Sequence, residues 1–149
     1  MQLHDVDSPW KEPELWRSVD ALAHPLYYAA RIGIPELVLK VIALGVNINA
    51  EGGYYGTALQ AASAHGHDKV VQILLDAGAD VKTKGGSYGH ALQAASEGVH
   101  DKIVQILLDA GADANTGGGE YDNALQAASA HGHDTVAQIL LDAGADVNT

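Results

Sequence analysis

The sequence has no cysteine and no phenylalanine, and only one methionine and two tryptophans among its 149 residues. The absence of cysteine excludes disulfides, zinc–thiolate sites and thiol chemistry. Alanine, leucine, valine and isoleucine therefore supply nearly all of the apolar volume. Small aliphatic side chains suit thin, closely stacked layers better than one thick core.

Basic residues are also scarce, because 8 Lys and Arg stand against 19 Asp and Glu, for a formal net charge of -11. Such a chain repels phosphate backbones, so we expect no nucleic-acid partner, whereas a basic protein would be attracted. Residues 1–5 lack the basic start and apolar run of a signal peptide. The apolar stretch around residues 37–46 is short and contains Lys40, so no membrane partner is expected. An intracellular, cytoplasmic location is the expectation.

An internal repeat is the strongest signal in the chain. The segment Ala58–Ser63 (ALQAAS) recurs at residues 91–96 and again at 124–129, each time after 33 residues. Residues 57–83 and 123–149 are identical at 23 of 27 positions. A more divergent copy begins at His24-Pro25-Leu26 and closes at residues 45–49. Four units are therefore present.

Each unit has the same pattern. An Ala/Leu/Gln segment of about two helical turns is followed by a Gly-containing break and a longer amphipathic segment, which in the second unit begins at Asp68. Gly78 follows the last apolar residue, where a left-handed residue ends a helix, and a Gly-rich, Tyr-containing loop leads to the next unit. Two short helices cannot bury their apolar faces alone, so neighbouring units must stack.

The period and these motifs resemble the ankyrin repeat, which begins Thr-Pro-Leu-His-x-Ala and ends Gly-Ala-Asp-Val-Asn. Thr57–Ala62 and Gly78–Val81 carry the match, and it extends over about residues 20–149. The Gly-rich loops also resemble fungal ankyrin arrays of NACHT/NLR-like proteins. The resemblance implies an all-α solenoid of four helix-turn-helix units with hairpin-like loops, at about residues 21–53, 54–86, 87–119 and 120–149.

Two departures from the family pattern generate predictions. The histidine that follows leucine is replaced by Gln60, Gln93 and Gln126, so its hydrogen bond with threonine is replaced or lost. In the third unit the glycine between the helices is Val99, with Gly98 one place earlier. Because a β-branched residue at positive φ is strained, we expect the turn to shift so that Gly98 becomes the left-handed residue.

The ends of the chain differ from the repeats. Residues 1–20 match no unit, but residues 12–19 read as a short helix with Pro13 in its first turn, and we expect it to cap the first repeat. The last unit has no polar capping repeat after it. This predicts either a fragment of a longer array or self-association through the uncapped C-terminal repeat.

Three patterns suggest chemistry but have simpler explanations. The HxH pairs at residues 65–67 and 131–133 lie two repeats apart, or ~20 Å at about 10 Å per helix layer, so they cannot share one zinc ion. We expect His67, His100 and His133 to be structural turn residues of the repeat. The repeated aspartates, such as Asp76 and Asp80, recur at one position of each unit and are expected to be turn and helix-end residues. The glycine runs lack the Lys-Ser/Thr of a phosphate loop. We therefore expect no enzyme, metal or cofactor.

The positions at which the copies differ are more informative for binding. In the ankyrin family, hairpin tips and inner-helix ends together form the concave recognition surface. Three loop tyrosines share one repeat position and are expected to line up along one edge, either for packing or as an aromatic edge for a partner. The candidate protein-binding surface consists of Arg31, Glu51, Tyr54, Tyr55, His65, Lys84, Ser87, Tyr88, Glu97, Glu120, Tyr121, Asp122 and His131.

The leading hypothesis is a non-enzymatic protein–protein recognition module that uses this concave face. A structural spacer or regulatory arm within a larger NACHT-type protein is the alternative. An engineered, consensus-like repeat protein would also have units this similar, although the divergent first unit argues against it.

Overall fold

The computed structural model describes residues 25–147. The N-terminal segment 1–20 and its expected capping helix lie outside the described residues. Within them the helices run over α3 (Pro25–Ile32), α4 (Pro35–Ala43), α5 (Ala58–Ala64), α6 (Asp68–Asp76), α7 (Ala91–Glu97), α8 (Asp101–Asp109), α9 (Ala124–Ala130) and α10 (Asp134–Asp142). Strands β1 (Glu51–Gly53) and β2 (Gly56–Thr57) form one antiparallel hairpin.

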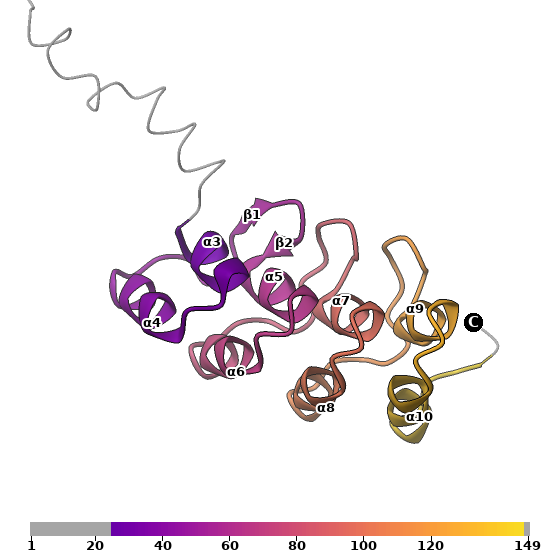
Figure 1. Ribbon diagram of the computed structural model, residues 1–149. Helices are drawn as coiled ribbons and strands as arrows, with labels where there is room; N and C mark the ends of the chain where they lie inside the picture. Colours follow the sequence, from indigo (N-terminus) through magenta and orange to yellow (C-terminus); the bar gives the residue numbers. More distant parts are fainter. Residues whose placement is uncertain (1–24, 148–149) are drawn as a thin grey trace, which may run out of the picture.

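The helices form four pairs that stack side by side (Figure 1). Helices α3, α5, α7 and α9 make an inner row, helices α4, α6, α8 and α10 make an outer row, and the loops project beyond the inner row. The expected helical solenoid of four units with hairpin-like loops is confirmed. The β1–β2 hairpin is the one small sheet among residues 25–147.

The core lies between the two rows and is continuous from the first pair to the last. Every residue of α5 except the last is buried, and its alanines allow the neighbouring inner helices to approach closely. The outer helices bury a single stripe, which in α6 is Val70, Val71 and Leu74. No helix within residues 25–147 is long and apolar enough to cross a membrane.

The buried side chain of Gln60 joins one repeat to the loop of the next. Its Oε1 accepts a hydrogen bond from the Thr57 backbone N–H at 2.7 Å, and the Thr57 hydroxyl accepts from the Gln60 N–H at 3.3 Å, which caps α5. Its Nε2 donates to the carbonyls of Gly85 at 2.9 Å and Gly89 at 2.8 Å. The glutamine therefore replaces the threonine–histidine hydrogen bond and also holds the next loop in place.

The neighbouring repeats also hold the following loop through the side chain at this position. In the third repeat, Gln93 Nε2 donates to the carbonyls of Gly118 and Asp122. In the first repeat the equivalent residue is Tyr27, whose hydroxyl accepts a hydrogen bond from the Tyr55 N–H at 3.0 Å. Each inner helix of these repeats thus fixes the loop that follows.

The expected shift of the turn in the third repeat is wrong, because Val99 itself has a φ of 60° while Gly98 has a helix-like φ of -84°. Two bonds keep the turn in register with the other repeats: the His100 N–H donates to the Ala95 carbonyl at 3.1 Å, and its Nε2 bonds the Ala64 carbonyl at 3.1 Å. A one-residue shift would break both. The strain at Val99 is local, since this residue is 48% exposed.

We predict that Val99→Gly raises the free energy of unfolding by about 1 kcal/mol, because it removes the left-handed strain of a β-branched residue. The matched change in the fourth repeat is Gly132→Val, since Gly132 has a φ of 70° and an added Cβ would meet nothing within 4 Å. This variant should lose a similar amount of stability. Urea unfolding measures both, and equal stability of Val99→Gly and the wild type would show that Val99 is unstrained.

Candidate functional site

Histidines at the turn between the helices tie successive repeats together. The Nε2 atoms of His67 and His133 bond the carbonyls of Arg31 at 3.0 Å and Glu97 at 2.9 Å, each 36 residues away, and His100 does the same between them. The structural role predicted for these three histidines is confirmed. Within residues 25–147 no three His, Asp or Glu side chains are grouped to hold a metal ion.

The repeated aspartates also have structural bonds. Asp76 ends α6 and accepts a hydrogen bond from Gln72 Nε2 at 3.0 Å, a contact that recurs in α8 and α10. Asp80 accepts from the Lys82 N–H at 2.8 Å within the following turn. Helix-end and turn roles are therefore confirmed for these residues.

Loop tyrosines and inner-helix ends meet in the second and fourth repeats. The ring of His65 packs edge-on against Tyr55 at a centroid distance of 4.9 Å, and His131 packs in the same way against Tyr121 at 5.5 Å. The Nδ1 atoms of His65 and His131 each bond a carbonyl one helical turn earlier, at 2.9 and 3.1 Å. The imidazoles are thus fixed in place against the tyrosines.

The third repeat departs from this arrangement. Gly98 stands where the others have His65 and His131, so no imidazole contacts Tyr88 within residues 25–147. Tyr88 instead stacks on Tyr55, with centroids 5.9 Å apart and an interplanar angle of 9°. The expected alignment of tyrosines is therefore partly realised, because Tyr121 pairs with its own histidine and makes no ring contact with Tyr88.

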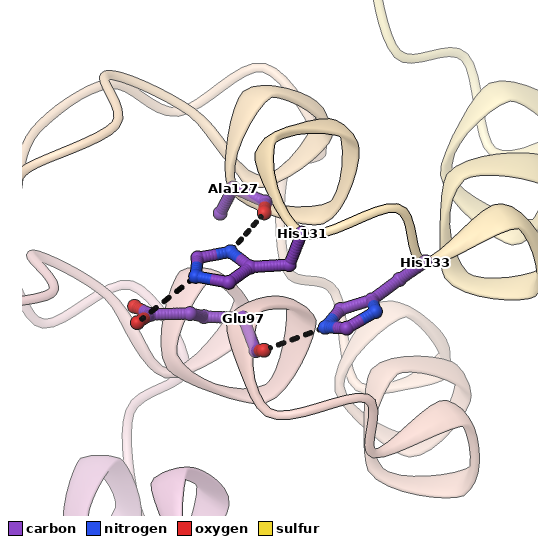
Figure 2. Close-up of polar contacts among 4 residues, drawn as sticks. All are labelled: Glu97, Ala127, His131 and His133. Carbon is purple, nitrogen blue, oxygen red and sulfur yellow. Dashed lines mark hydrogen bonds and ion pairs between the residues drawn. The ribbon is translucent and has the colours of Figure 1, made fainter.

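Glu97 occupies the position beside this glycine, at the end of α7 (Figure 2). Its Oε1 lies 3.9 Å from His131 Nε2, and its backbone carbonyl bonds His133. Its Oε2 is out of contact with solvent and has no hydrogen-bond partner in the described part of the chain. Equivalent positions in the second and fourth repeats hold Ala64 and Ala130, so this carboxylate is specific to the third repeat.

The negative charge of Glu97 affects the pKa of two tyrosine hydroxyls. Burial and the neighbouring Glu97 carboxylate, with smaller effects of Tyr55, Tyr54 and Glu120, raise the pKa of Tyr88 to about 12. Burial and the charges of Glu120 and Glu97 also raise the pKa of Tyr121. The carboxylates of Glu97 and Glu120 therefore place negative charge near both tyrosine hydroxyls.

Comparison with known proteins identifies the repeat. The family model for ankyrin repeats (3 copies) matches residues 15–85 and again 86–149. The chain belongs to the ankyrin repeat family. Ankyrin repeats are generally protein-interaction modules and are typically non-enzymatic.

One curated relative is similar to part of this ankyrin array. The azaphilone pigments biosynthesis cluster protein L of Monascus ruber is 49% identical over 67 residues. The match covers 40% of this chain and 14% of the relative's length. This chain thus spans only a small part of the relative that it resembles.

The ankyrin fold brings most of the predicted surface residues together, although not all. Those joined by ring contacts, the ion pair or shared electrostatics are Tyr54, Tyr55, His65, Tyr88, Glu97, Glu120, Tyr121 and His131. Five others lie outside this group: Arg31 is exposed at the end of α3, Glu51 is in β1, Lys84 lies beside Gly118, Ser87 has a buried hydroxyl, and Asp122 is an exposed loop residue.

Two features of this site were not predicted from the sequence. The role of Gln93 in holding residues 118–122 follows from contacts between repeats, although its recurrence beside Leu92 was a visible signal. The effect of Gly98, which leaves Tyr88 without an imidazole beside it, could also be seen only in the structure.

At the last repeat, Leu141 and Val147 are exposed, and self-association through this face stays a prediction.

The raised pKa of Tyr88 predicts how stability depends on pH. The fold favours the neutral phenol, so its stabilisation is complete below the ordinary pKa of about 10 and is lost as pH rises from 10 through about 12. We expect the free energy of unfolding to fall more steeply over pH 10–12 in the wild type than in Tyr88→Phe.

Urea unfolding at several pH values measures this slope, and absorbance at 295 nm follows the phenolate directly. Tyr28→Phe is the control, because Tyr28 lies in the first repeat and is not among the groups that raise the pKa of Tyr88. If Tyr88→Phe retains the full loss of stability above pH 10, the late-titrating tyrosine is a different one.

Proposed function

We propose that this ankyrin array is a non-enzymatic recognition module that binds another protein through its hairpin tips and inner-helix ends. One observation carries the proposal: side chains that differ between nearly identical repeats converge on one side of the stack. Tyr54 packs against Tyr55, which stacks on Tyr88 of the next repeat. The Glu97 carboxylate lies 3.9 Å from His131 of the fourth repeat, and the ring of this histidine packs against Tyr121, the neighbour of Glu120. Variable residues gathered on a rigid repeat framework are what selective binding needs.

The charge of the chain favours a basic partner. The net charge is -11, and Glu97 and Glu120 contribute negative charge near the tyrosines. Complementary charge accelerates association and disfavours acidic competitors, while the aromatic rings supply contact area. A basic protein surface fits this face better than a nucleic acid, because a phosphate backbone would meet the same negative field.

A regulatory arm inside a longer NACHT-type protein is the second proposal. It is supported by the match to the Monascus ruber protein, in which the similar segment occupies only 14% of the length. In this case the array would contact its own chain, through the same face.

A pull-down from cell extract tests the first proposal. The surface variant combines Tyr54→Ala, Glu97→Ala and Glu120→Ala. A control variant combines Gln72→Ala, Asp109→Ala and Asp142→Ala, which also removes two negative charges, but from the exposed side of the outer helices. We expect proteins retained by the wild type to be lost from the surface variant and kept by the control.

Two results would count against the proposal. Retention of every partner by the surface variant would show that this face is not used. Equal loss from both variants would show that only net charge matters. Circular dichroism of both variants confirms that each remains folded before the comparison is made.

A further inference from the structure

The first repeat exposes more large apolar side chains than any other repeat within residues 25–147. Six of the ten such side chains in this part of the chain belong to it: Tyr28, Ile32, Ile34, Leu37, Leu39 and Leu44. Helices α3 and α4, which carry most of them, form one end of the stack (Figure 1). A group of exposed apolar side chains at the end of a solenoid marks a surface that another segment covers.

Comparison of equivalent positions shows which way these side chains face. Leu37 is 40% exposed, whereas its equivalents in the other three repeats, such as Val136, are at most 1% exposed. Tyr28 is 37% exposed, and its equivalents are alanines, such as Ala127, that are at most 2% exposed. The fourth repeat has no described repeat after it, so its preceding neighbour buries these two positions. Tyr28 and Leu37 therefore lie on the face that each later repeat packs against its predecessor.

This face does not have the chemistry that the later repeats use to stack. Ile34 occupies the position of the turn histidine His67, whose ring bonds the Arg31 carbonyl of the preceding repeat. An isoleucine side chain cannot make such a bond. Tyr28 places a phenol ring where the later inner helices have an alanine that allows close approach. The first-repeat face, which we define as Tyr28, Ile34 and Leu37, thus suits an apolar segment that is not an ankyrin repeat.

The segment that precedes α3 has the pattern of such a cover. Its apolar residues Leu15, Trp16, Val19 and Leu22 have the spacing that places them on one side of a helix. The segment leads directly into Pro25, which is the first residue of α3 and is exposed. It can therefore reach the first-repeat face without a connection that crosses the stack.

Formal charge also matches this segment to the first repeat. Residues 1–24 hold five acidic and two basic residues. Residues 25–50 hold Arg31 and Lys40 against Glu36, whereas acidic residues outnumber basic ones in each of the other three repeats. Arg31 and Lys40 are both exposed, and each lies one helical turn from a residue of the first-repeat face. An acidic segment is thus attracted to this end of the stack rather than to the acidic fourth repeat.

We propose that residues 12–22 of this chain form a helix whose apolar side packs on the first-repeat face. The ring of Trp16 supplies the largest single apolar area of the contact. A second copy that used the same face would bring Arg31 and Lys40 of two chains close together, which is unfavourable. This inference is independent of the recognition function, because the tyrosine-lined surface belongs to other repeats.

Tryptophan fluorescence tests the contact in the full chain. Both tryptophans, Trp10 and Trp16, lie in the segment, so Trp10→Phe leaves Trp16 as the only one. We expect the Trp16 emission of this folded protein to lie at a shorter wavelength than in concentrated urea. Acrylamide should also quench it less than in the unfolded chain, because the ring is covered.

A charge placed in the first-repeat face should release the segment. Ile34→Asp is the main variant, because residue 34 is the N-cap of α4 and aspartate is favoured at that position, so the fold is kept. We expect its Trp16 emission and quenching to move to the values of the unfolded chain. Leu141→Asp is the matched control, since Leu141 is 39% exposed at the opposite end of the stack, and it should change neither. Leu37→Asp replaces Ile34→Asp if circular dichroism shows that the latter is unfolded.

Three results would overturn the proposal. Trp16 could be quenched in the folded chain as strongly as in urea, or it could stay protected in a folded variant of the first-repeat face. Equal release by Leu141→Asp would show that any added charge has the same effect. Sedimentation identifies the remaining occupant: a dimer whose dissociation on dilution exposes Trp16 would assign the face to a second copy, and the proposal would be wrong.

Discussion

The hydrogen bonds of one buried amide side chain hold the loops of this protein in place. Gln60 is 1% exposed, and it bonds the start of its own helix through Oε1 and the loop of the next repeat through Nε2. Loop backbone that leaves the stack would otherwise have unpaired carbonyls facing a buried surface, which is costly. Because Gln93 repeats the arrangement, the loops project at regular intervals beyond the inner helices.

Residues that make recurring hydrogen bonds are structural, whereas residues that make none can vary between repeats. The glutamines and the turn histidines each make the same bond between successive repeats, so a change at any of them would disturb two units at once. The helix-end aspartates repeat a bond that lies within their own helix. Within residues 25–147, loop tips and the last residues of the inner helices make no such recurring bond with their side chains. They can differ without loss of the fold, and Tyr54, Glu97 and Glu120 are among the positions where they do.

The periodic sequence predicted the fold well, because each helix depends mainly on local pattern. The amphipathic stripe and Gly78 located α6 and its end, and the repeat extended that prediction to α8 and α10. The turn at Val99 was not predictable from local preference, since a bond between His100 and Ala64, in a different repeat, overrides the strain. Local conformational preference does not predict the backbone conformation where hydrogen bonds between repeats determine it.

The candidate surface was predictable in part for the same reason. Comparing the copies identified Glu97 as different, and the pairing of Tyr55 with His65 follows from residues that recur together. That Glu97 Oε2 is buried without a hydrogen-bond partner among the described residues depends on how the third repeat packs against the fourth. The stack of Tyr88 on Tyr55 depends on the spacing of two loops. Neither appears in the sequence of a single repeat.

The most direct test of this division compares the free energies of unfolding of Gln60→Ala and Glu97→Ala in urea. We predict that Gln60→Ala loses about 2–4 kcal/mol, because it leaves buried backbone groups unpaired. Glu97→Ala should stay within about 0.5 kcal/mol of the wild type, since it removes a carboxylate with no donor. A stable Gln60→Ala together with a strongly destabilised Glu97→Ala would contradict the separation of structural from binding residues.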